Sequence, residues 1–247
     1  MVENAQITST NMEQQVIFIT GATGGLGTAM VKHFEKTGAR LALHSFQQET
    51  YDVACEHAWF QADLSDAASI PNLVQQVLDR FGRIDVLINN AGISRNGVSW
   101  KLDTNDWDEV LAINLSAPFH LIKGVLPSMR SNQFGRIISI SSVVAQTGVA
   151  GTAAYAASKA GLLGLTKTVA KETATSGITV NALALGYFDS GMISEVSPEL
   201  QEHIRLQIPK QRLGSVDTIL ATLDWLLLPA SDYITGQTIS LNGGLHS

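Results

Sequence analysis

The chain has 247 residues, of which 45% are hydrophobic and 15% charged. That composition is typical of a folded globular protein and excludes a disordered chain. The formal net charge of -6 argues against nucleic acid or an anionic membrane surface as the main partner. Residues 1–13 are polar and lack the apolar core of a secretory signal, so we expect a flexible extension ahead of one domain at 14–247.

The location of the protein is predicted from what the sequence lacks. No stretch approaches the roughly 18 consecutive apolar residues of a membrane span, so no membrane partner is expected. Cys55 is the only cysteine. It can form neither an internal disulfide nor a metal cluster, so no metal site is predicted and a reducing cytoplasm is the expected location.

Short runs rich in Ile, Val and Leu alternate along the chain with longer stretches of helical periodicity. The runs are continuous rather than alternating, which is typical of strands covered on both faces. The expected strands are 16–20, 41–44, 58–61, 86–89, 136–141, 179–184 and 238–241. The expected helices lie near 25–38, 66–81, 104–131, 154–176, 197–206 and 215–228. This alternation predicts a single α/β domain with a doubly wound, mainly parallel sheet.

A glycine-rich segment follows the first expected strand and precedes the first expected helix. Glycine permits a tight turn and a close approach of the backbone to a pyrophosphate. The start of the helix offers free N–H groups and a positive dipole end to an anion. Such a turn is often only a turn, but this placement favours cofactor binding. The expected contacts are Gly21, Thr23, Gly24, Gly25, Leu26 and Gly27.

Three residues have the types and spacing of a general acid/base site. Ser142 ends the fifth expected strand, Tyr155 lies 13 residues later, and Lys159 follows after four more. The spacing of four puts Tyr155 and Lys159 on one helix face. A nearby ammonium favours the phenolate, so we expect the Tyr155 pKa to fall from about 10 toward neutrality. The alternative to a catalytic pair is a solvated helix face, or a buried Tyr beside a Lys whose apolar stem packs along the surface while its ammonium stays in water.

These segments together resemble the short-chain dehydrogenase/reductase family over about residues 14–245. The resemblance rests on Thr20 to Gly27, Asp63-Leu64, Asn89-Asn90-Ala91-Gly92 and the Ser142, Tyr155 and Lys159 spacing. It implies a Rossmann-type fold and an NAD(P)(H)-dependent oxidoreductase acting on CH–OH groups, which interconverts a ketone and a secondary alcohol by direct hydride transfer.

The resemblance also implies a role for each catalytic residue. Tyr155 is the acid/base, Ser142 orients the substrate oxygen, and Lys159 lowers the Tyr155 pKa and holds the nicotinamide ribose. Asn114 completes a proton relay, in which its main-chain carbonyl holds a water that relays protons to Lys159. Pro118, four residues on, has no N–H, so the helical hydrogen bond to that carbonyl cannot form. We therefore expect a free Asn114 carbonyl and a local bend in the helix.

Further cofactor contacts are implied outside the glycine-rich turn. Asp63 and Leu64 would meet the adenine, although Asp63 could also cap a helix. Asn90, Ala91 and Gly92 would line the adenosine side. Near the nicotinamide the expected residues are Gly186, Phe188 and Ser190, with Leu185 where the family usually has proline. Residues 187–212 would then form a substrate lid.

The end of the second strand bears on cofactor choice. NAD-preferring relatives carry an acid near the position of Ser45, which accepts the ribose hydroxyls and repels a 2′-phosphate. This chain has no acid there and no basic residue at Gly24. His44 and Ser45 could hydrogen-bond a phosphate, although a strand-end His is commonly structural. NADP(H) is therefore favoured over NAD(H).

Within the family the chain is most similar to β-ketoacyl-acyl carrier protein reductases. Gly135-Arg136-Ile137-Ile138 and Tyr233-Ile234-Thr235-Gly236 are among the similar segments. Many of these are scaffold motifs, so both a small ketone and a 3-oxoacyl thioester stay open as substrates. Acyl carrier protein is acidic and needs a basic surface, but Gln133 and Ser176 stand where such reductases often have arginine. This departure argues against acyl carrier protein as the partner without excluding it, and favours a free small ketone or acyl thioester. The family implies a homotetramer, and apolar residues such as Phe119 could be core or interface.

Two other functions compete with a dehydrogenase. One is a non-catalytic NADP(H)-binding sensor or partner-binding protein on the same fold. The complete set of Asn114, Ser142, Tyr155 and Lys159 argues against it, because a sensor does not need all four. The other is an isomerase or dehydratase that uses the same tyrosine. Turnover of a carbonyl and product analysis separate these functions.

Overall fold

The computed structural model describes residues 12–47, 54, 56–190, 193 and 197–246. Three features expected from the sequence lie wholly or partly outside these residues. They are the N-terminal extension up to residue 11, the segment that contains Cys55, and part of the expected lid at 191–192 and 194–196.

The described residues form one parallel sheet of seven strands in the order β3-β2-β1-β4-β5-β6-β7. Every pair of neighbouring strands in this sheet is parallel, so the doubly wound sheet expected from the sequence is confirmed. The strand order reverses between β1 and β4. In such sheets ligands bind outside the carboxyl ends of the strands, beside this reversal. The strands are β1 (Val16–Ile19), β2 (Arg40–Ser45), β3 (Ala58–Gln61), β4 (Val86–Asn89), β5 (Gly135–Ser142), β6 (Ile178–Leu185) and β7 (Thr238–Leu241).

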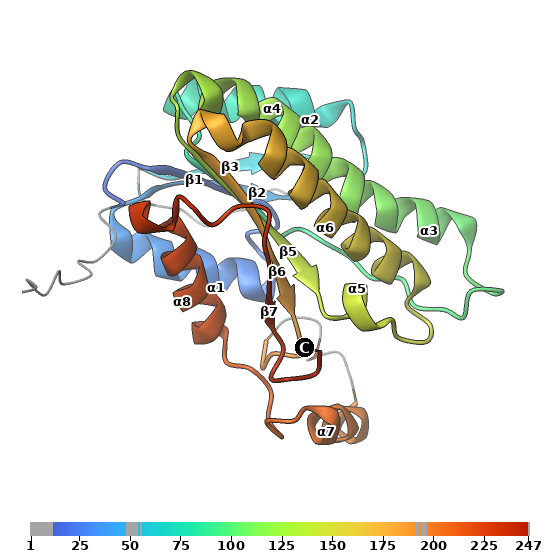
Figure 1. The fold of residues 1–247 in the computed structure, drawn as a ribbon. Coiled ribbons are helices and arrows are strands. Elements are labelled where there is room, and N and C mark those ends of the chain that lie inside the picture. The colour runs from blue at the N-terminus through green and yellow to red at the C-terminus, as the bar shows by residue number, and fades with distance from the viewer. Residues whose placement is uncertain (1–11, 48–53, 55, 191–192, 194–196, 247) are drawn as a thin grey trace, which may run out of the picture.

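Helices cover both faces of the sheet (Figure 1). Helices α2, α4 and α6 pack on one face, and α1 and α8 on the other, while α7 lies beyond the strand ends. The α-helices are α1 (Gly25–Phe34), α2 (Ser69–Phe81), α3 (Thr104–Leu111), α4 (Ala117–Ser131), α5 (Val144–Thr147), α6 (Ala153–Thr173), α7 (Pro198–Gln207) and α8 (Val216–Leu227). Single 3-10 turns lie at Glu35–Thr37, Ala174–Ser176 and Pro229–Ser231, and a π-helical turn, η2, spans Ala112–Ser116.

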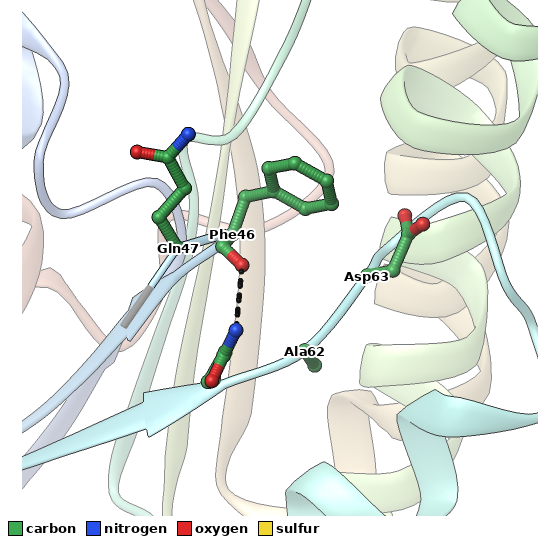
Figure 2. Close-up of a pocket in the computed structure, with 5 residues that line it drawn as sticks. Phe46, Gln47, Ala62 and Asp63 are labelled. Carbon is green, nitrogen blue, oxygen red and sulfur yellow. Dashed lines mark hydrogen bonds between the residues drawn. The ribbon is translucent and has the colours of Figure 1, made fainter. Parts of the chain in front are cut away.

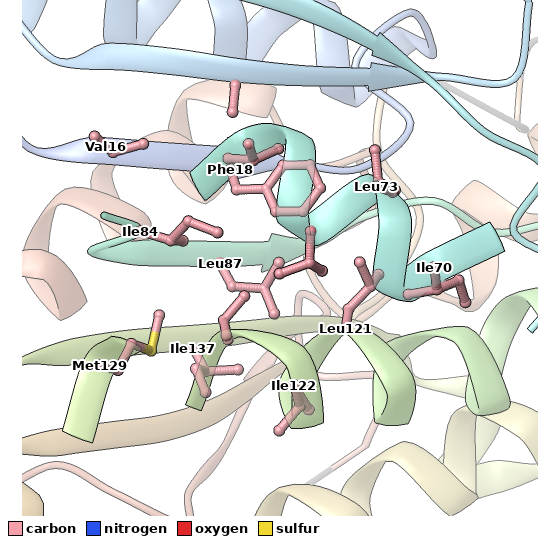
Figure 3. Close-up of a cluster of buried hydrophobic side chains, with 14 of the residues drawn as sticks. Val16, Phe18, Ile70, Leu73, Ile84, Leu87, Leu121, Ile122, Met129 and Ile137 are labelled. Carbon is pink, nitrogen blue, oxygen red and sulfur yellow. The ribbon is translucent and has the colours of Figure 1, made fainter. Parts of the chain in front are cut away.

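The continuous apolar strands supply two hydrophobic clusters, one on each face. In β1, Val16 and Phe18 belong to one cluster and Ile17 and Ile19 to the other, and all four are fully buried. Figure 3 shows the first cluster, where side chains of β1, β4 and β5 meet α2 and α4. Burying each such side chain contributes roughly 1.5–3 kcal/mol. The strands are therefore fixed from both sides, and their carboxyl ends are held in register.

One helix was predicted over 104–131, and the structure divides this stretch into two helices and a turn. Helix α3 passes through the π-helical turn η2 into α4, and the turn ends just before Pro118. This irregularity is the local distortion expected at that place. Helix α5 was not expected from the sequence, because its four residues are too few to display a helical period.

The helical stretch Thr104–Ser131 is long and apolar enough to cross a membrane by length and composition alone, with a mean hydropathy of 1.3 over its most apolar window. It packs here between α2 and α6 on the sheet (Figure 1). Side chains such as Leu121 and Val125 belong to the first core cluster, and 39% of that window is buried. Phe119, which the sequence left undecided between core and interface, is 46% exposed. Two other apolar residues of these helices, Ile122 and Leu162, are buried.

Asp85 joins the amino ends of β1 and β4, and we expect its loss to destabilise the fold. Its carboxylate is 1% exposed, accepts a hydrogen bond from Val16 N at 2.9 Å and pairs with Arg83. Asp85→Ala leaves a buried N–H without a partner, so the free energy of unfolding in urea should fall by about 2–3 kcal/mol. Asp108→Ala, at an exposed position of α3, is the control and should change it by less than about 0.5 kcal/mol. Equal effects of the two changes would contradict the role of Asp85.

Candidate active site

The glycine-rich turn connects β1 to α1 at the carboxyl edge of the sheet. Gly21 has a φ of +63°, and a Cβ on Gly27 would lie 2.2 Å from the Gly21 carbonyl oxygen. No larger residue fits at Gly27 without moving this backbone. Helix α1 begins at Gly25 with no side-chain cap from Gly24, so its first N–H groups have no partner within the helix. Thr23, Gly24 and Gly25 are exposed, and Leu26 packs against the second core cluster.

Residues after β4 hold this turn in place. The Thr20 hydroxyl oxygen accepts hydrogen bonds from Asn90 N at 3.0 Å and Ala91 N at 3.1 Å. The Asn90 side chain donates to the carbonyls of Thr20 and Gly21 at 2.9 and 3.0 Å. A Cβ on Gly21 would lie 2.9 Å from Ala91 Cα. The two segments therefore pack backbone to backbone and hold the turn, whose exposed helix start at Gly25 fits an anion such as the pyrophosphate of a dinucleotide.

Ser142, Tyr155 and Lys159 come together beside the end of β5. Ser142 ends β5 and is 8% exposed, and its hydroxyl forms a hydrogen bond with the Tyr155 phenol. Tyr155 and Lys159 share one face of α6, with Lys159 Nζ 5.7 Å from the centre of the tyrosine ring. The Lys159 ammonium donates to the Ile140 carbonyl at 2.8 Å. Strand end and helix thus place a hydroxyl, a phenol and an ammonium in one cluster.

Asn114 joins this cluster through Ser158. The Asn114 amide nitrogen donates to the Ile93 carbonyl at 2.8 Å and to the Ser158 hydroxyl at 3.1 Å. Ser158 in turn donates to the Tyr155 carbonyl at 2.8 Å. A Cβ on Gly92 would lie 3.2 Å from Lys159 Nζ and 3.3 Å from Asn114 Oδ1. Gly92 therefore allows Lys159 and Asn114 to meet at one point.

The π-helical turn contains Asn114. Ala117 N donates to the Ala112 carbonyl, five residues back, as π-helical geometry requires. Pro118 follows directly and has no N–H to donate to Asn114. The free Asn114 carbonyl, and with it the proton relay, stays a prediction.

Burial sets the protonation of the two titratable residues. Desolvation raises the pKa of Tyr155 above its usual value, and the hydrogen bond with Ser142 offsets part of this rise. Burial lowers the pKa of Lys159 to about 8. The predicted fall of the Tyr155 pKa is wrong in this arrangement, because desolvation of the phenol outweighs its polar contacts and the ammonium donates to Ile140. Tyr155 is therefore a protonated phenol at neutral pH.

A pocket of about 450 Å³ opens between the ends of β2 and β3. Figure 2 shows the Phe46 ring and the Asp63 carboxylate on opposite sides of its opening. Asp63 also accepts hydrogen bonds from Ser65 N and Oγ at 2.8 and 2.7 Å. Contrary to the alternative interpretation, it does not cap a helix, because α2 begins at Ser69 and its N-cap residue is Ala68. Leu64 is buried. The lining residues are Phe46, Gln47, Gln61, Ala62 and Asp63.

The predicted nicotinamide end lies after β6. Gly186 N donates to the Leu241 carbonyl at 2.8 Å, and a Cβ on Gly186 would lie 2.7 Å from Asn242 Cα. The Phe188 ring is buried against Gly214, so its side chain is part of the core. Ser190 is partly buried at the last residue described before 191–192.

Comparison with known proteins places these features in a family. The family model described as "short chain dehydrogenase" matches residues 15–201. The chain belongs to the short-chain dehydrogenase family. "Nodulation protein G" of Azospirillum brasilense is 38% identical over 95% of this chain and 99% of its own length. The "3-oxoacyl-[acyl-carrier-protein] reductase FabG" of Staphylococcus aureus is 37% identical, over 92% and 96% respectively. The protein of that name from Escherichia coli K12 is 34% identical, over 96% and 99%.

Three residues near the site of this short-chain dehydrogenase were not expected from its sequence. Thr20 anchors the segment after β4, and Ser158 links Asn114 to α6. Tyr187 raises the pKa of Tyr155 electrostatically, so its phenol lies near the cluster. Ser158 precedes Lys159 on the same helix, a position that could have signalled its role. Thr20 belongs to the glycine-rich motif, but its contacts with Asn90 and Ala91, like the effect of Tyr187, act across the fold and no local pattern indicates them.

Proposed function

We propose that this short-chain dehydrogenase is a nicotinamide-dependent oxidoreductase that interconverts a ketone and a secondary alcohol. The observation that carries the proposal is the cluster of Ser142, Tyr155 and Lys159 next to the glycine-rich turn. A non-catalytic sensor is not favoured. It would have no need for a phenol in hydrogen-bond contact with a buried hydroxyl beside a buried ammonium.

The proposed mechanism follows from the contacts of these side chains. When bound, the nicotinamide cofactor supplies the hydride for reduction of the carbonyl carbon. Tyr155 donates its phenolic proton to the substrate oxygen, and Ser142 holds that oxygen by a hydrogen bond. The Lys159 ammonium stabilises the negative charge that develops on the phenol oxygen. Asn114 holds the η2 turn against Ile93 by hydrogen bonds of its side chain, and its main-chain carbonyl would bind a water that passes a proton to Lys159.

The preferred cofactor is proposed to be NADP(H), with little discrimination against NAD(H). No carboxylate stands at Ser45 to repel a 2′-phosphate, which favours NADP(H). The chain also has no Lys or Arg between Arg40 and Arg80. Without a cation to pair with the 2′-phosphate, we expect the two values of kcat/KM to differ by about tenfold or less.

The proposed substrates are small ketones and 3-oxoacyl thioesters. Two similar proteins are named 3-oxoacyl-[acyl-carrier-protein] reductases, which supports the thioester. Acyl carrier protein is the less favoured partner, because Gln133 and Ser176 replace the arginines that an acidic partner would need and Ser176 is buried. A homotetramer and a cytoplasmic location also remain proposals.

A scan of acetoacetyl thioesters and small ketones, with NADPH and with NADH, tests this function. Loss of the reduced-nicotinamide absorbance should depend on the ketone, and deuterium from labelled cofactor should appear on the product's carbinol carbon. If both cofactors bind and no carbonyl consumes either, the sensor replaces this proposal. Conversion of substrate without transfer of deuterium would point to an isomerase or dehydratase.

The rate of reduction should fall at alkaline pH, because the ammonium of Lys159 is lost there. Burial lowers the pKa of Lys159 to about 8. We expect kcat/KM for ketone reduction to be level between about pH 6 and 7.5 and to fall about tenfold per pH unit above 8. Initial rates at constant ionic strength measure this. A level profile to pH 10 would show that the charge on Lys159 is not needed.

A further inference from the structure

His44 makes three contacts through its ring and its main chain at the carboxyl end of β2. The residue is 3% exposed. Its Nδ1 accepts a hydrogen bond from Gly21 N at 3.2 Å, and its Nε2 lies 3.1 Å from the Ala62 carbonyl oxygen. Its own carbonyl accepts from Ala22 N at 2.9 Å. One residue thus contacts the glycine-rich turn and the segment after β3.

The partners of the ring determine its tautomer. A backbone N–H can only donate, so Nδ1 must be the unprotonated acceptor facing Gly21. A carbonyl can only accept, so Nε2 must carry the hydrogen that it donates to Ala62. Burial lowers the pKa of His44, which keeps the ring in this neutral form. Both ring nitrogens are used, so His44 is not free to bind a 2′-phosphate as the sequence had left open.

The ring crosses a gap that the sheet does not bridge directly. Strands β1 and β3 are not neighbours, because β2 lies between them. Gly21 follows β1 and opens the phosphate-binding turn, whereas Ala62 follows β3 and lines the pocket with Asp63. A single imidazole therefore fixes the distance between these two parts of the cofactor groove.

We propose that His44 is a positioning residue for dinucleotide binding, which holds the glycine-rich turn and the Ala62–Asp63 segment at the spacing that the cofactor requires. This inference rests on the proposed function, since it takes a nicotinamide dinucleotide as the ligand. His44 itself contacts backbone and acts on the cofactor through Gly21 and Ala62.

The chain offers a matched control in His57, the other buried histidine with the same type of contact. Its Nδ1 accepts from Leu41 N at 3.1 Å, and it is 6% exposed. Leu41 lies near the amino end of β2, away from the carboxyl edge that carries the site. Loss of His57 removes an equivalent hydrogen bond without touching the groove.

The test compares His44→Leu, His44→Asn, His44→Gln and His57→Leu with the wild type. We would measure the Kd of NADP⁺ and NAD⁺ by calorimetry, the cofactor KM and kcat, and Tm. His44→Leu should weaken cofactor binding about tenfold or more, with kcat at saturating cofactor within about twofold. Asparagine can replace the Nδ1 acceptor and glutamine the Nε2 donor, so each should recover part of the affinity. His57→Leu should lower Tm and leave the Kd within about twofold.

The outcomes separate this inference from the proposed function. A wild type that binds neither nucleotide overturns the proposed function and this inference with it. A wild type that binds, with His44→Leu binding equally well, overturns the role of His44 alone. The role of His44 is also overturned if His57→Leu weakens cofactor binding as much as His44→Leu, because the loss of affinity would then come from general destabilisation of the fold. Long-range ¹H–¹⁵N correlation spectra should show His44 protonated at Nε2, and a proton at Nδ1 would also overturn the proposal.

Discussion

Tyr155→Phe should lower kcat for ketone reduction by about 10²–10⁴-fold and leave cofactor affinity almost unchanged. The change removes one hydroxyl, which forms the hydrogen bond with Ser142 and would donate the proton to the substrate oxygen. The ring, its packing on α6 and the neighbouring Lys159 stay in place. Single-turnover rates with NADPH measure the loss, and fluorescence titration of the cofactor measures the binding.

Tyr233→Phe is the control for this change, because Tyr233 is 98% exposed and lies outside the cluster. It should keep the wild-type rate and affinity. If Tyr155→Phe also kept the wild-type rate, the phenol would not be the acid, and the half-buried Tyr187 nearby would be the next group to test. If Tyr155→Phe instead lost cofactor affinity tenfold, the phenol would act mainly in binding.

The elements of the fold follow from local patterns in the chain. In β1, a continuous run from Val16 to Ile19 predicts burial on both faces, and alternate residues do enter different clusters. Gly21 and Gly27 likewise predict the tight turn after β1, since their backbone contacts leave no room for a Cβ. Helix α5 and the π-helical turn carry no such period, so only a bend near Pro118 could be anticipated.

The site is predicted less completely than the fold, because its details depend on contacts between distant segments. The spacing of Ser142, Tyr155 and Lys159 predicts their proximity. It does not predict that the Lys159 ammonium donates to the Ile140 carbonyl, nor that desolvation raises the Tyr155 pKa. The position of His44 at a strand end was visible in the sequence. Its two ring contacts, to residues 23 positions before it and 18 after it, were not.

Lys159→Met should stabilise the protein by about 2 kcal/mol at pH 7 while lowering turnover by at least about 10²-fold. Lys159 is 4% exposed, and burial lowers its pKa from 10.5 to about 8. A shift of that size opposes folding by about 3 kcal/mol when the lysine is charged in both states. Methionine fills similar space without a charge, and loss of the hydrogen bond to Ile140 subtracts about 1 kcal/mol from the gain.

The free energy of unfolding should also change with pH, in a direction set by the lowered pKa of Lys159. The folded pKa lies below the unfolded value, so between about pH 8 and 10.5 the unfolded state holds the proton more strongly. The free energy of unfolding of the wild type should therefore rise with pH across this window, relative to Lys159→Met, which lacks the group. Urea unfolding at pH 7 and pH 10 measures the difference.

Lys167→Met, at an exposed position of the same helix, is the control. It should change neither the free energy of unfolding at pH 7 nor its change between pH 7 and pH 10 by more than about 0.5 kcal/mol. A destabilised Lys159→Met would mean that the ammonium supports the fold. A stabilised and inactive one would mean that this chain keeps a buried charge against its own stability, for the chemistry at Tyr155.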